Sequence, residues 1–594
     1  MSTRPSPSAS ASAPAPPPGR PSPRTDAPEG ASAGPRAADL RARTPRVLGL
    51  LTSLVGLVDL VGTLVRLWRP RLHEVGALLP GVVTISVSAS ILTGLALLVL
   101  GHGLRRRKRR AWRAVVVLLA VSAAAGAVHL SPVHAVVSVA LLVVLVVRRG
   151  DFRAQGDPQS RWRAVRVFLG LLLADLVVGT AVVYAAERFE VGGAPSLAAA
   201  LSEVAAGLVG LDGPVGFATH RAADLVGTVL AGLGLLTLAA TAYVVLRSPE
   251  PRAVLSDDDA QRLRPLLRRG EDSLGYFALR TDKAVLWSPS GRAAVGYRVV
   301  GGVMLASGDP VGPSDAWPEA ILAFQEQAAA HAWTVAVLGC SEQAGEAWAE
   351  HAGLDALELG DEAVLTTEDF TLEGRPMRNV RQMVSRVRRH GYETRVDRVG
   401  ELEDGLRATV LADAAAWRGS ETERGFSMAL GRVADPRDPD AVLVTAWHEG
   451  TVRAMVQLVP WGADGLSLDL MRRDVDAAPG VNELLVAAVM EAAPRLGVTR
   501  VSLNFAAFRA VFERGERLGA GPLLRLRRSV LIVASRWFQI ESLYRFNAKF
   551  QPEWQSRFLL YPGPGDLPRV SLAALEAEAF LVWPTWRRLR EGQA

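Results

Sequence analysis

The 594-residue chain contains a single cysteine, Cys340. One thiol can form neither an intramolecular disulfide nor a cysteine-based metal cluster. Cys340 ends the strand-like run TVAVLGC, so we interpret it as a small buried residue rather than a nucleophile. Lysine is nearly as rare, because only Lys108, Lys283 and Lys549 are lysines among the 67 basic residues. The composition therefore excludes a disulfide scaffold, and we expect no metal.

Histidine is also scarce, with nine in the whole chain. His331, His351, His390 and His448 follow the membrane-like part of the sequence without a nearby serine or cysteine in a recognisable triad motif. We therefore do not expect histidine-based nucleophilic catalysis.

Residues 1–42 lack apolar stretches and consist mainly of Ser, Ala, Pro, Gly and Arg. Such a composition cannot form a packed core and does not resemble a signal peptide. We predict a disordered cytoplasmic tail.

The next 200 residues are, in contrast, strongly apolar. A membrane-spanning helix needs about 20 mostly apolar residues. Four of the apolar stretches are that long, and the two shorter ones flank Pro132, which suggests either a tight hairpin of two spans or a re-entrant pair. Together they predict a membrane domain of about six helices at residues 43–248, with stretches at 47–67, 78–100, 114–130, 133–147, 165–186 and 225–246.

The arginines indicate how this domain is oriented. Basic residues are dense before the first stretch, in RRRKRR (105–110) between the second and third, and at 148–166 between the fourth and fifth. Short loops rich in Lys and Arg stay on the cytoplasmic side. We therefore expect a multi-pass plasma-membrane protein with both termini and the C-terminal part in the cytoplasm.

Three carboxylates fall inside or at the edges of the predicted spans: Asp59, Asp175 and Asp224. A carboxylate in a membrane is unfavourable and needs a partner. Helix packing and a lipid headgroup path are both open explanations.

From about residue 250 the pattern is that of a soluble α/β protein, and one order of elements occurs twice. Strands near 283–288, 294–300 and 302–306 precede a helix at 315–331, a strand at 334–339 and a helix at 342–352. Later, a three-stranded meander precedes a helix at 481–496 and the strand VTRVSLNF. Three antiparallel strands, a helix and a further strand is the core order of the GNAT acyltransferase fold. We expect a multi-pass α-helical membrane domain followed by tandem GNAT-like domains at 249–370 and 371–594.

Acetyl-CoA is a poor candidate for the acyl donor. A CoA-binding loop of the type Gln/Arg-x-x-Gly-x-Gly/Ala presents backbone N–H groups to the pyrophosphate at a helix start. ERLGAG (516–521) has an acidic first position, and RRHGYE (388–393) ends in Glu. We expect no cofactor and a different acyl donor.

The segment RNVRQMVSRVRR (378–389) predicts an amphipathic helix. One face is apolar, and the other carries five arginines without an interleaved carboxylate. A guanidinium suits bidentate phosphate contacts, so this face suggests tRNA or an anionic lipid surface, with a plain solvated face as the alternative. The arginines are Arg378, Arg381, Arg386, Arg388 and Arg389.

The segment 536–561, RWFQIESLYRFNAKFQPEWQSRFLLY, is rich in aromatic and charged residues. On a helix, Ile540, Leu543, Phe546 and Phe550 would face the core, while Glu541, Arg545 and Lys549 would line up at four-residue spacing. The alternatives are a surface ion-pair ladder and a site whose wall includes Trp554, Phe558 and Tyr561.

Five motifs stand out in the second part of the chain: SLDLMRRDVDAAPGVNELL, SLNFAAFRAVFERGE, FNAKFQPEWQSRFLLYP, RNVRQMVSRVRRHGY and GFSMALGR. Together they resemble the synthase domain of the lysylphosphatidylglycerol synthase (MprF-type) family over roughly residues 255–590, and their order along the chain also matches. The last two motifs look most like the membrane and synthase portion of two-part LysX-type enzymes.

The resemblance implies an aminoacyl-tRNA-dependent phosphatidylglycerol aminoacyltransferase. It would transfer an aminoacyl group, expected to be lysyl, to phosphatidylglycerol, thereby lowering the negative charge of the membrane and giving resistance to cationic antimicrobial peptides. No class II synthetase motif precedes Ala594, so we expect a separate synthetase to supply the donor. Alanine or arginine as the amino acid, product flipping and a homo-oligomer remain open.

The matching motifs supply the candidate site residues. We expect Asp469 and Glu483 to act as a general base or to anchor the cationic amino acid, with pairing to Arg472 or Arg473 as the alternative. Arg545 and Lys549 would hold lipid phosphate or stabilise the oxyanion. We expect substrate binding by Arg472, Asn482, Asn504, Arg509 and Trp554, with Asn482, Asn504 and Arg509 lining the same cleft.

Two other functions fit the same sequence. One is a tRNA-dependent transferase with another acceptor, such as a peptide or peptidoglycan precursor. The other is a membrane lipid transporter or lipid-binding protein with an inactive GNAT-like pair. Retention of Asp469, Glu483, Arg545 and Lys549 within intact motifs favours an active enzyme.

Overall fold

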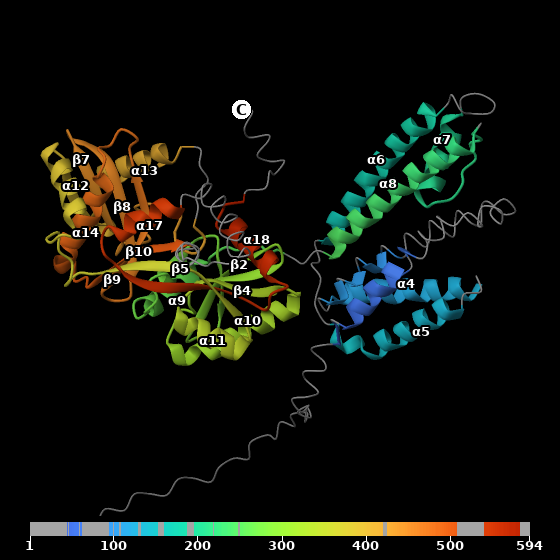
Figure 1. Ribbon diagram of the computed structural model, residues 1–594, viewed down its shortest axis with the longest axis horizontal. Coiled ribbons are helices and arrows are strands. Elements are labelled where there is room, and N and C mark those ends of the chain that lie inside the picture. The colour runs from blue at the N-terminus through green and yellow to red at the C-terminus, as the bar shows by residue number, and fades with distance from the viewer. Residues whose placement is uncertain are drawn as a thin grey trace, which may run out of the picture.

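The computed structural model describes, with short gaps, residues 44–61, 94–152 and 160–246, and then residues 250–419, 425–507 and 540–581. Figure 1 shows apolar helices in the N-terminal part and an α/β part after them. This is the order of fold classes that the sequence predicted.

The apolar region includes helical segments within 47–58 and 96–105, followed by α4 (Arg109–Val128), α5 (Pro132–Val147), α6 (Ser160–Ala185), α7 (Leu197–Leu208) and α8 (His220–Leu246). Helix α4 packs on α5, and α6, α7 and α8 pack on one another. Within α6 and α8, Ala164–Ala185 and Ala222–Ala242 are long and apolar enough to cross a membrane. They correspond to the fifth and sixth predicted spans. Parts of the first two spans lie outside the described residues, so the number six stays a prediction.

The outward faces of α6 and α8 are apolar. Leu173 and Val177 on α6 and Leu225 and Leu236 on α8 are all more than 60% exposed. A continuous exposed apolar surface of this kind suits hydrocarbon rather than water. Between these helices, Asp175 accepts a hydrogen bond from Thr237 Oγ1 (2.6 Å), which supports the helix-packing explanation for this carboxylate.

The sequence did not predict α7. This short helix begins after Ser196, whose side chain caps Ala199 N, and its buried Glu203 accepts a hydrogen bond from Val215 N (2.9 Å). Its 12 residues are too few to cross a bilayer alone.

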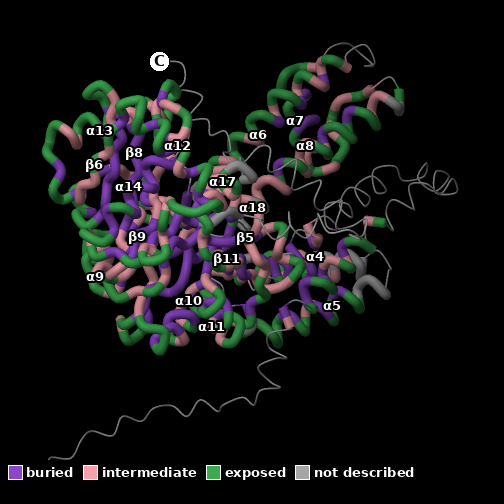
Figure 2. The backbone as a smooth tube through the Cα atoms, turned by 60° about the vertical axis from the view of Figure 1, so that its left-hand side comes forward, coloured by how far each residue is buried: buried purple, intermediate pink, exposed green. Residues whose placement is uncertain are grey.

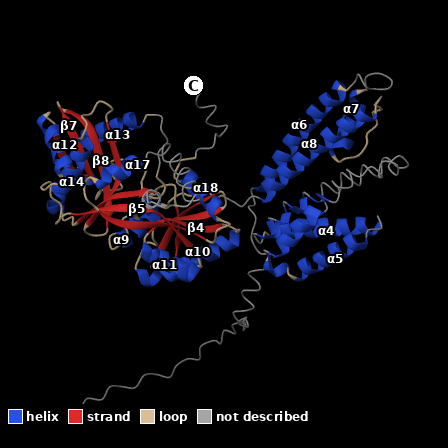
Figure 3. Ribbon diagram, viewed as in Figure 1, coloured by secondary structure: helices blue, strands red, loops and turns tan. Residues whose placement is uncertain are grey.

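The α/β part contains one sheet of eleven strands among the described residues, in the order β1-β2-β3-β4-β11-β5-β10-β9-β8-β7-β6. Figure 3 shows these strands in red, flanked by blue helices. The strands are β1 (Ala284–Trp287), β2 (Ala294–Val300), β3 (Val303–Ser307), β4 (Thr334–Cys340), β5 (Asp355–Thr366), β6 (Glu393–Arg398), β7 (Val442–His448), β8 (Thr451–Trp461), β9 (Gly465–Arg473), β10 (Arg500–Ala507) and β11 (Glu553–Tyr561).

Helices cover both faces of this sheet. In the first half, α10 (Trp317–His331) and α11 (Glu342–Ala352) pack on one face and α18 (Leu567–Ala577) on the other. In the second half, α12 (Arg378–Arg389) and α14 (Val481–Leu496) share one face, and α13 (Asp404–Arg418) covers the other. The remaining helices of this part are α9 (Asp257–Leu267) and α17 (Ile540–Ala548). Figure 2 shows buried residues gathered along the strands and α14.

The repeated order of elements is present in both halves. An antiparallel meander (β1-β2-β3 or β7-β8-β9) is followed by a helix and then by a strand parallel to the last meander strand. The predicted strand 294–300 and the helices 342–352 and 481–496 match the observed bounds. Cys340 is fully buried at the end of β4, as predicted for a structural residue.

The two halves exchange strands. β4 of the first half pairs with β11, which comes from the C-terminal end of the chain, and β10 of the second half pairs with β5. β5 and β11 then pair with each other along nine residues. The boundary between two domains at residues 370 and 371 stays a prediction. The hydrogen-bonded sheet runs across this boundary without interruption.

Helix α17 corrects one prediction. The helix ends at Ala548, so Lys549 and Phe550 lie in the following turn and not on a helical face. Leu543, predicted to face the core, is 38% exposed, whereas Phe550 is 2% exposed. Lys549 therefore stands one residue beyond the end of α17, and its described ion-pair partner is Glu483 of α14.

Candidate functional site

The second half has a parallel pair of strands that separates along its length. β9 and β10 are hydrogen-bonded only where Arg500–Ser502 lie beside Gly465–Ser467. Beyond this point β9 continues along β8, while β10 continues along β5, with an irregularity in that pairing between Ser502 and Phe505. Asp469 on β9 and Asn504 on β10 follow directly after the paired segment. This end of the pair is the centre of the candidate site.

Asp469 has a fixed and enclosed carboxylate. Oδ1 accepts a hydrogen bond from Leu430 N (2.7 Å), and Oδ2 accepts one from Gln457 Nε2 (2.6 Å). Burial raises the pKa of Asp469 to about 6, because it outweighs these two hydrogen bonds and the nearby Arg432, all of which lower the pKa. A carboxylate with this pKa can take up and release a proton near neutral pH.

Asn504 holds the same region together from β10. Its φ of 68° lies in the left-handed region, which asparagine tolerates better than most residues. In this conformation Nδ2 donates to Met428 O (3.2 Å) and to Leu468 O (3.0 Å). Asn504 therefore connects β9 to the loop that also binds Asp469.

That loop, Gly425–Gly431, is the GFSMALG part of a motif that the sequence had singled out. Glu578, at the end of α18, accepts hydrogen bonds from Phe426 N (2.7 Å), Ser427 N (2.8 Å) and Ser427 Oγ. Arg280 Nη1 donates to Gly425 O (2.8 Å) and Ala429 O (3.0 Å). Asp469 is thus positioned by a loop that is itself fixed by residues about 150 positions away on either side. Sequence reasoning missed Arg280 and Glu578, because neither lies near the loop in the chain.

A second pair of candidate residues meets at the start of α14. Lys549 Nζ lies 2.7 Å from Glu483 Oε1. The Glu483 side chain is 7% exposed and stands in the first turn of the helix, where negative charge is favourable. The amide oxygens of Asn482 and Asn547 are buried near these elements with no hydrogen-bond partner in the described structure. The start of α14 therefore offers acceptors as well as one ion pair.

These two groups lie on opposite faces of the sheet. Asp469 binds Gln457, which also accepts from Ala434 N of the α13-side core, while Glu483 belongs to α14 on the other face. Asn482 and Asn504, which we expected to line one cleft, are separated in the same way, and Arg509 lies outside the described residues. Asp469 accepts hydrogen bonds from Leu430 and Gln457, and Glu483 pairs with Lys549. Among the described contacts, neither carboxylate pairs with Arg472 or Arg473, which was the alternative role for both.

The other substrate-binding candidates are placed as follows. Arg472 Nη1 donates to Ala414 O of α13 (2.6 Å). Arg545 is exposed on α17. Trp554 stands on β11 with its ring 5.3 Å from that of Tyr544, and it packs against the α14-side core.

The arginine-rich helix α12 has the predicted apolar stripe, since Val380, Val384 and Val387 are buried. Arg378, Arg386, Arg388 and Arg389 are exposed, and the half-buried Arg381 donates to Leu372 O (2.7 Å). The sequence showed no carboxylate within the helix, but Arg388 pairs with Glu491 of α14 (2.7 Å). One of the five positive charges is therefore neutralised by a residue 103 positions away.

Comparison with known proteins identifies the family. The family model described as "Phosphatidylglycerol lysyltransferase, C-terminal" matches residues 263–561, about half of the chain. The chain belongs to this family. A second model, "Transmembrane region of lysyl-tRNA synthetase", matches residues 40–246, so the apolar helices form a transmembrane region.

The relatives are longer than this family member. "Lysylphosphatidylglycerol biosynthesis bifunctional protein LysX" of Rhodococcus opacus (strain B4) is 40% identical over 559 residues, covering 92% of this chain and 50% of that protein. The protein of the same name from Nocardia farcinica (strain IFM 10152) is 42% identical over 492 residues, covering 81% and 43%. The chain spans about half the length of the relatives it matches.

Two solved structures of similar proteins cover the α/β part. L-PGS from Bacillus licheniformis gives a TM-score of 0.49 at 21% identity, covering 56% of this chain and 99% of that one. The C-terminal domain of a putative lysylphosphatidylglycerol synthetase from Agrobacterium fabrum gives 0.45 at 23% identity, covering 53% and 96%.

Proposed function

We propose that this protein is a membrane enzyme that transfers a lysyl group from lysyl-tRNA to phosphatidylglycerol. The observation that carries the proposal is Asp469, a half-buried residue whose carboxylate, with a pKa of about 6, is held by Leu430 and Gln457 where β9 and β10 separate. Family membership and the transmembrane region support the same reaction.

The chemistry requires little beyond positioning and one proton transfer. A hydroxyl oxygen of the lipid's glycerol headgroup attacks the carbonyl carbon of the tRNA ester. The bond from that carbon to the ribose oxygen breaks, and the hydroxyl proton passes to the departing ribose oxygen. In the proposed mechanism Asp469 accepts this proton from the attacking hydroxyl and returns it to the leaving group.

We assign the positive groups of the α14 face to the phosphates. The exposed arginines of α12, on the same face of the sheet as α14, would contact the tRNA backbone. Lys549, oriented by Glu483, and the exposed Arg545 would bind lipid phosphate. Asn482, Asn504, Arg472 and Trp554 are proposed to position the two substrates.

The proposed location is the cell membrane, with both termini and the α/β part in the cytoplasm, where charged tRNA is present. The arginine-rich loops between the apolar stretches support this orientation, because short loops rich in basic residues stay on the cytoplasmic side.

The test is transfer of labelled lysine from charged tRNA to lipid in membranes containing the protein. We expect labelled lysyl-phosphatidylglycerol that disappears when the tRNA is digested with RNase beforehand. A pool of other charged amino acids in the same assay identifies the amino acid. If no charged tRNA yields labelled lipid, the lipid-binding or altered-acceptor functions replace the proposal.

Variants assign the residues. Asp469→Ala and Lys549→Ala should each abolish transfer without preventing membrane insertion. Asp476→Asn, an exposed change close to β9, is the matched control and should transfer at the wild-type rate. Wild-type turnover in Asp469→Ala or Lys549→Ala would remove that residue from the site.

A further inference from the structure

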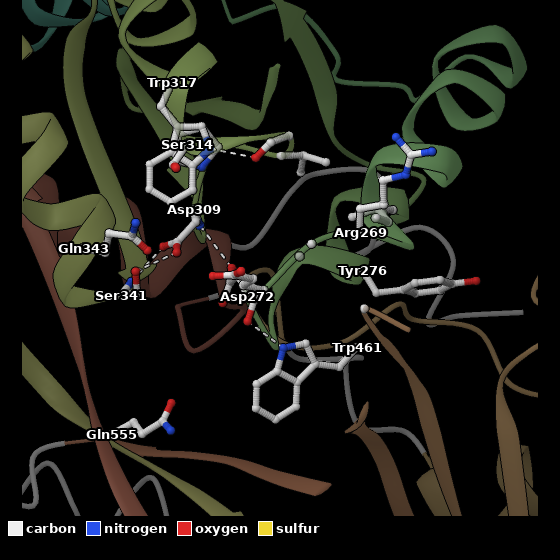
Figure 4. A pocket seen from close by; sticks show the side chains of 18 of the residues that line it. Arg269, Asp272, Tyr276, Asp309, Ser314, Trp317, Ser341, Gln343, Trp461 and Gln555 are labelled. Carbon is white, nitrogen blue, oxygen red and sulfur yellow. Dashed lines mark hydrogen bonds between the residues drawn. The ribbon is translucent and has the colours of Figure 1, made fainter. Parts of the chain in front are cut away.

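A cavity of about 960 Å³ lies in the first half, and of the residues assigned to the site around Asp469 and Glu483 only Trp554 lines it. It stands at the carboxyl ends of β3 and β4, the parallel pair of that half, and the β8–β9 turn of the second half closes one side with Trp461 and Gly462. The volume suits a small organic ligand. Figure 4 shows Asp309, Ser341 and Gln343 on one side of this cavity and Asp272 and Trp461 on another.

Negative charge predominates in the lining. The carboxylates are Glu271, Asp272, Asp309, Glu342 and Glu346, and the cationic groups are Arg269, Arg500 and Arg557. Two of these arginines already have carboxylate partners. Arg557 pairs with Asp272 (2.7 Å) and Glu362, and Arg500 pairs with Asp464 (3.4 Å).

Asp309 is the buried carboxylate of the lining that has no counter-ion among the described residues, whereas the other unpaired carboxylates, Glu271, Glu342 and Glu346, are exposed to solvent. It is 7% exposed, and its two oxygens accept hydrogen bonds from Ser341 N (2.7 Å) and Ser341 Oγ (2.6 Å). No Lys, Arg or His nitrogen of the described residues lies within 4 Å of it. Burial and the neighbouring Asp272 raise the pKa of Asp309 to about 7 despite the lowering effects of Arg557 and Ser341. A buried carboxylate beside an open cavity would be stabilised by a cation.

The walls suit an organic cation better than a hydrated metal ion. Trp317, Trp461 and Trp554 line the cavity. Trp317 Nε1 donates to Gly312 O (3.0 Å) and Trp461 Nε1 to Glu271 O (2.6 Å), so these two rings are held in place. Fixed indole rings provide apolar contact for an alkyl chain and attraction for an ammonium group. Phosphate is disfavoured, because Glu342 in the first turn of α11 and Glu346 one turn later place negative charge near the helix start that would otherwise attract an anion.

We propose that this cavity is a second binding site, which takes a ligand with a terminal ammonium on an alkyl chain and pairs that ammonium with Asp309. The chemistry is shared by a lysyl moiety and by a free aliphatic diamine. The inference does not depend on the proposed transfer reaction, because it rests on binding alone.

The experiment is calorimetric titration of the purified full-length protein in detergent, without tRNA or added lipid. The probes are lysine amide, 1,5-diaminopentane and norleucine amide, which has the alkyl chain but no terminal ammonium. We expect saturable binding of at least one of the first two and binding of norleucine amide that is about tenfold weaker or more. If lysine amide binds and the diamine does not, the ligand is the aminoacyl moiety, and the reverse result identifies a free diamine.

Variants locate the binding. Asp309→Asn keeps the shape of the side chain and should weaken binding about tenfold or more. Glu346→Lys, an exposed change at the rim that leaves the core intact, should weaken it as well. Asp315→Asn, exposed and paired with Arg292 outside the cavity, and Asp469→Asn in the other site should leave it unchanged.

Three outcomes would overturn the proposal: no saturable binding of either amine, equal binding of norleucine amide, or wild-type affinity in both Asp309→Asn and Glu346→Lys. If binding is lost only in Asp469→Asn, the amine occupies the second-half site and the proposal also fails. A protein that binds amines here but transfers no lysine would retain this inference and lose the proposed function.

Discussion

At the scale of single residues, burial makes two side chains unusual acids or bases. Asp469 has its pKa raised and Lys283 has its pKa lowered, in both cases mainly because charge is unfavourable in a buried position. They are also embedded in different ways. Asp469 adjoins the end of a separating strand pair, whereas Lys283 is fully buried and donates to Phe277 O (2.8 Å) and Ser307 Oγ (2.7 Å). The first therefore predicts a pH effect on rate and the second a pH effect on stability.

We expect transfer to rise with pH through about 6 and to level off above it, because only the deprotonated Asp469 can accept the hydroxyl proton. The measurement is the initial rate of lysyl transfer between pH 5 and 8 with saturating donor. Asp469→Asn should reduce the rate at every pH and remove the rise near 6. An unchanged pH profile in that variant would assign the proton transfer to another group.

Lys283 predicts that stability increases with pH. Its pKa is lowered from 10.5 to about 7 by burial and by Arg280, against the raising effects of Asp282, Glu578 and Asp272. Between these values the unfolded chain binds more protons than the folded one, so the free energy of unfolding rises with pH by at most about 1.4 kcal/mol per unit.

Lys283→Met lacks this contribution. The free energy of unfolding of the wild type, relative to that of the variant, should therefore rise by about 2 kcal/mol from pH 7 to pH 9. Chemical denaturation followed by tryptophan fluorescence at both pH values gives that difference. A constant difference would mean that Lys283 is charged in the folded protein.

At the scale of elements, the same face of α12 carries arginines of two kinds. Arg386 and Arg389 are exposed, while Arg388 is paired with Glu491. Neutralising a cation that already has a partner removes less positive potential than neutralising one that faces solvent.

We therefore predict that Arg386→Gln together with Arg389→Gln weakens tRNA binding and makes it less dependent on salt, whereas Arg388→Gln has a smaller effect. Filter binding of tRNA at several salt concentrations measures both affinity and slope. Equal slopes in all proteins would place the tRNA elsewhere.

These elements show which parts of the structure were predictable. The bounds of β2, α11 and α14 follow from local alternation or helical periodicity, and the sequence predicted them closely. The apolar stripe and exposed arginines of α12 were predictable for the same reason.

The errors have a common cause, which is contact between distant segments. Nothing near Gly425–Gly431 in the chain indicates that Glu578 holds this loop, and nothing near Arg388 indicates Glu491. Lys549 pairs with Glu483 on α14, a partner that its position after the end of α17 at Ala548 did not reveal. Residue types in the candidate site were therefore easier to predict than their partners or the face of the sheet on which they lie.

At the scale of the whole molecule, the exchanged strands make the two halves dependent on each other. β11 pairs with one edge of β4, and α18 packs on the same half of the sheet. Glu578, at the end of α18, binds the loop that holds Asp469. Removing the C-terminal segment should therefore disturb the first half of the sheet and the candidate site in the second half together.

We predict that a full-length chain truncated after Gln551 loses protease resistance in both halves and has no transfer activity. Limited proteolysis of membranes, with antibodies against a segment of each half, measures this. Truncation after Leu581, which keeps β11 and α18, is the control and should remain resistant. A resistant first half in the shorter chain would show that it folds independently.

The strand exchange also affects how the protein is made. A ribosome releases the chain from its N-terminal end, so β4 and β5 emerge more than 150 residues before the strand that lies between them. Until β11 appears, the facing edges of these two strands carry unpaired N–H and C=O groups, which are prone to join other chains. The α/β part should therefore complete its fold only near the end of synthesis, and prolonged pausing of translation after β5 should favour aggregation or chaperone capture over native folding.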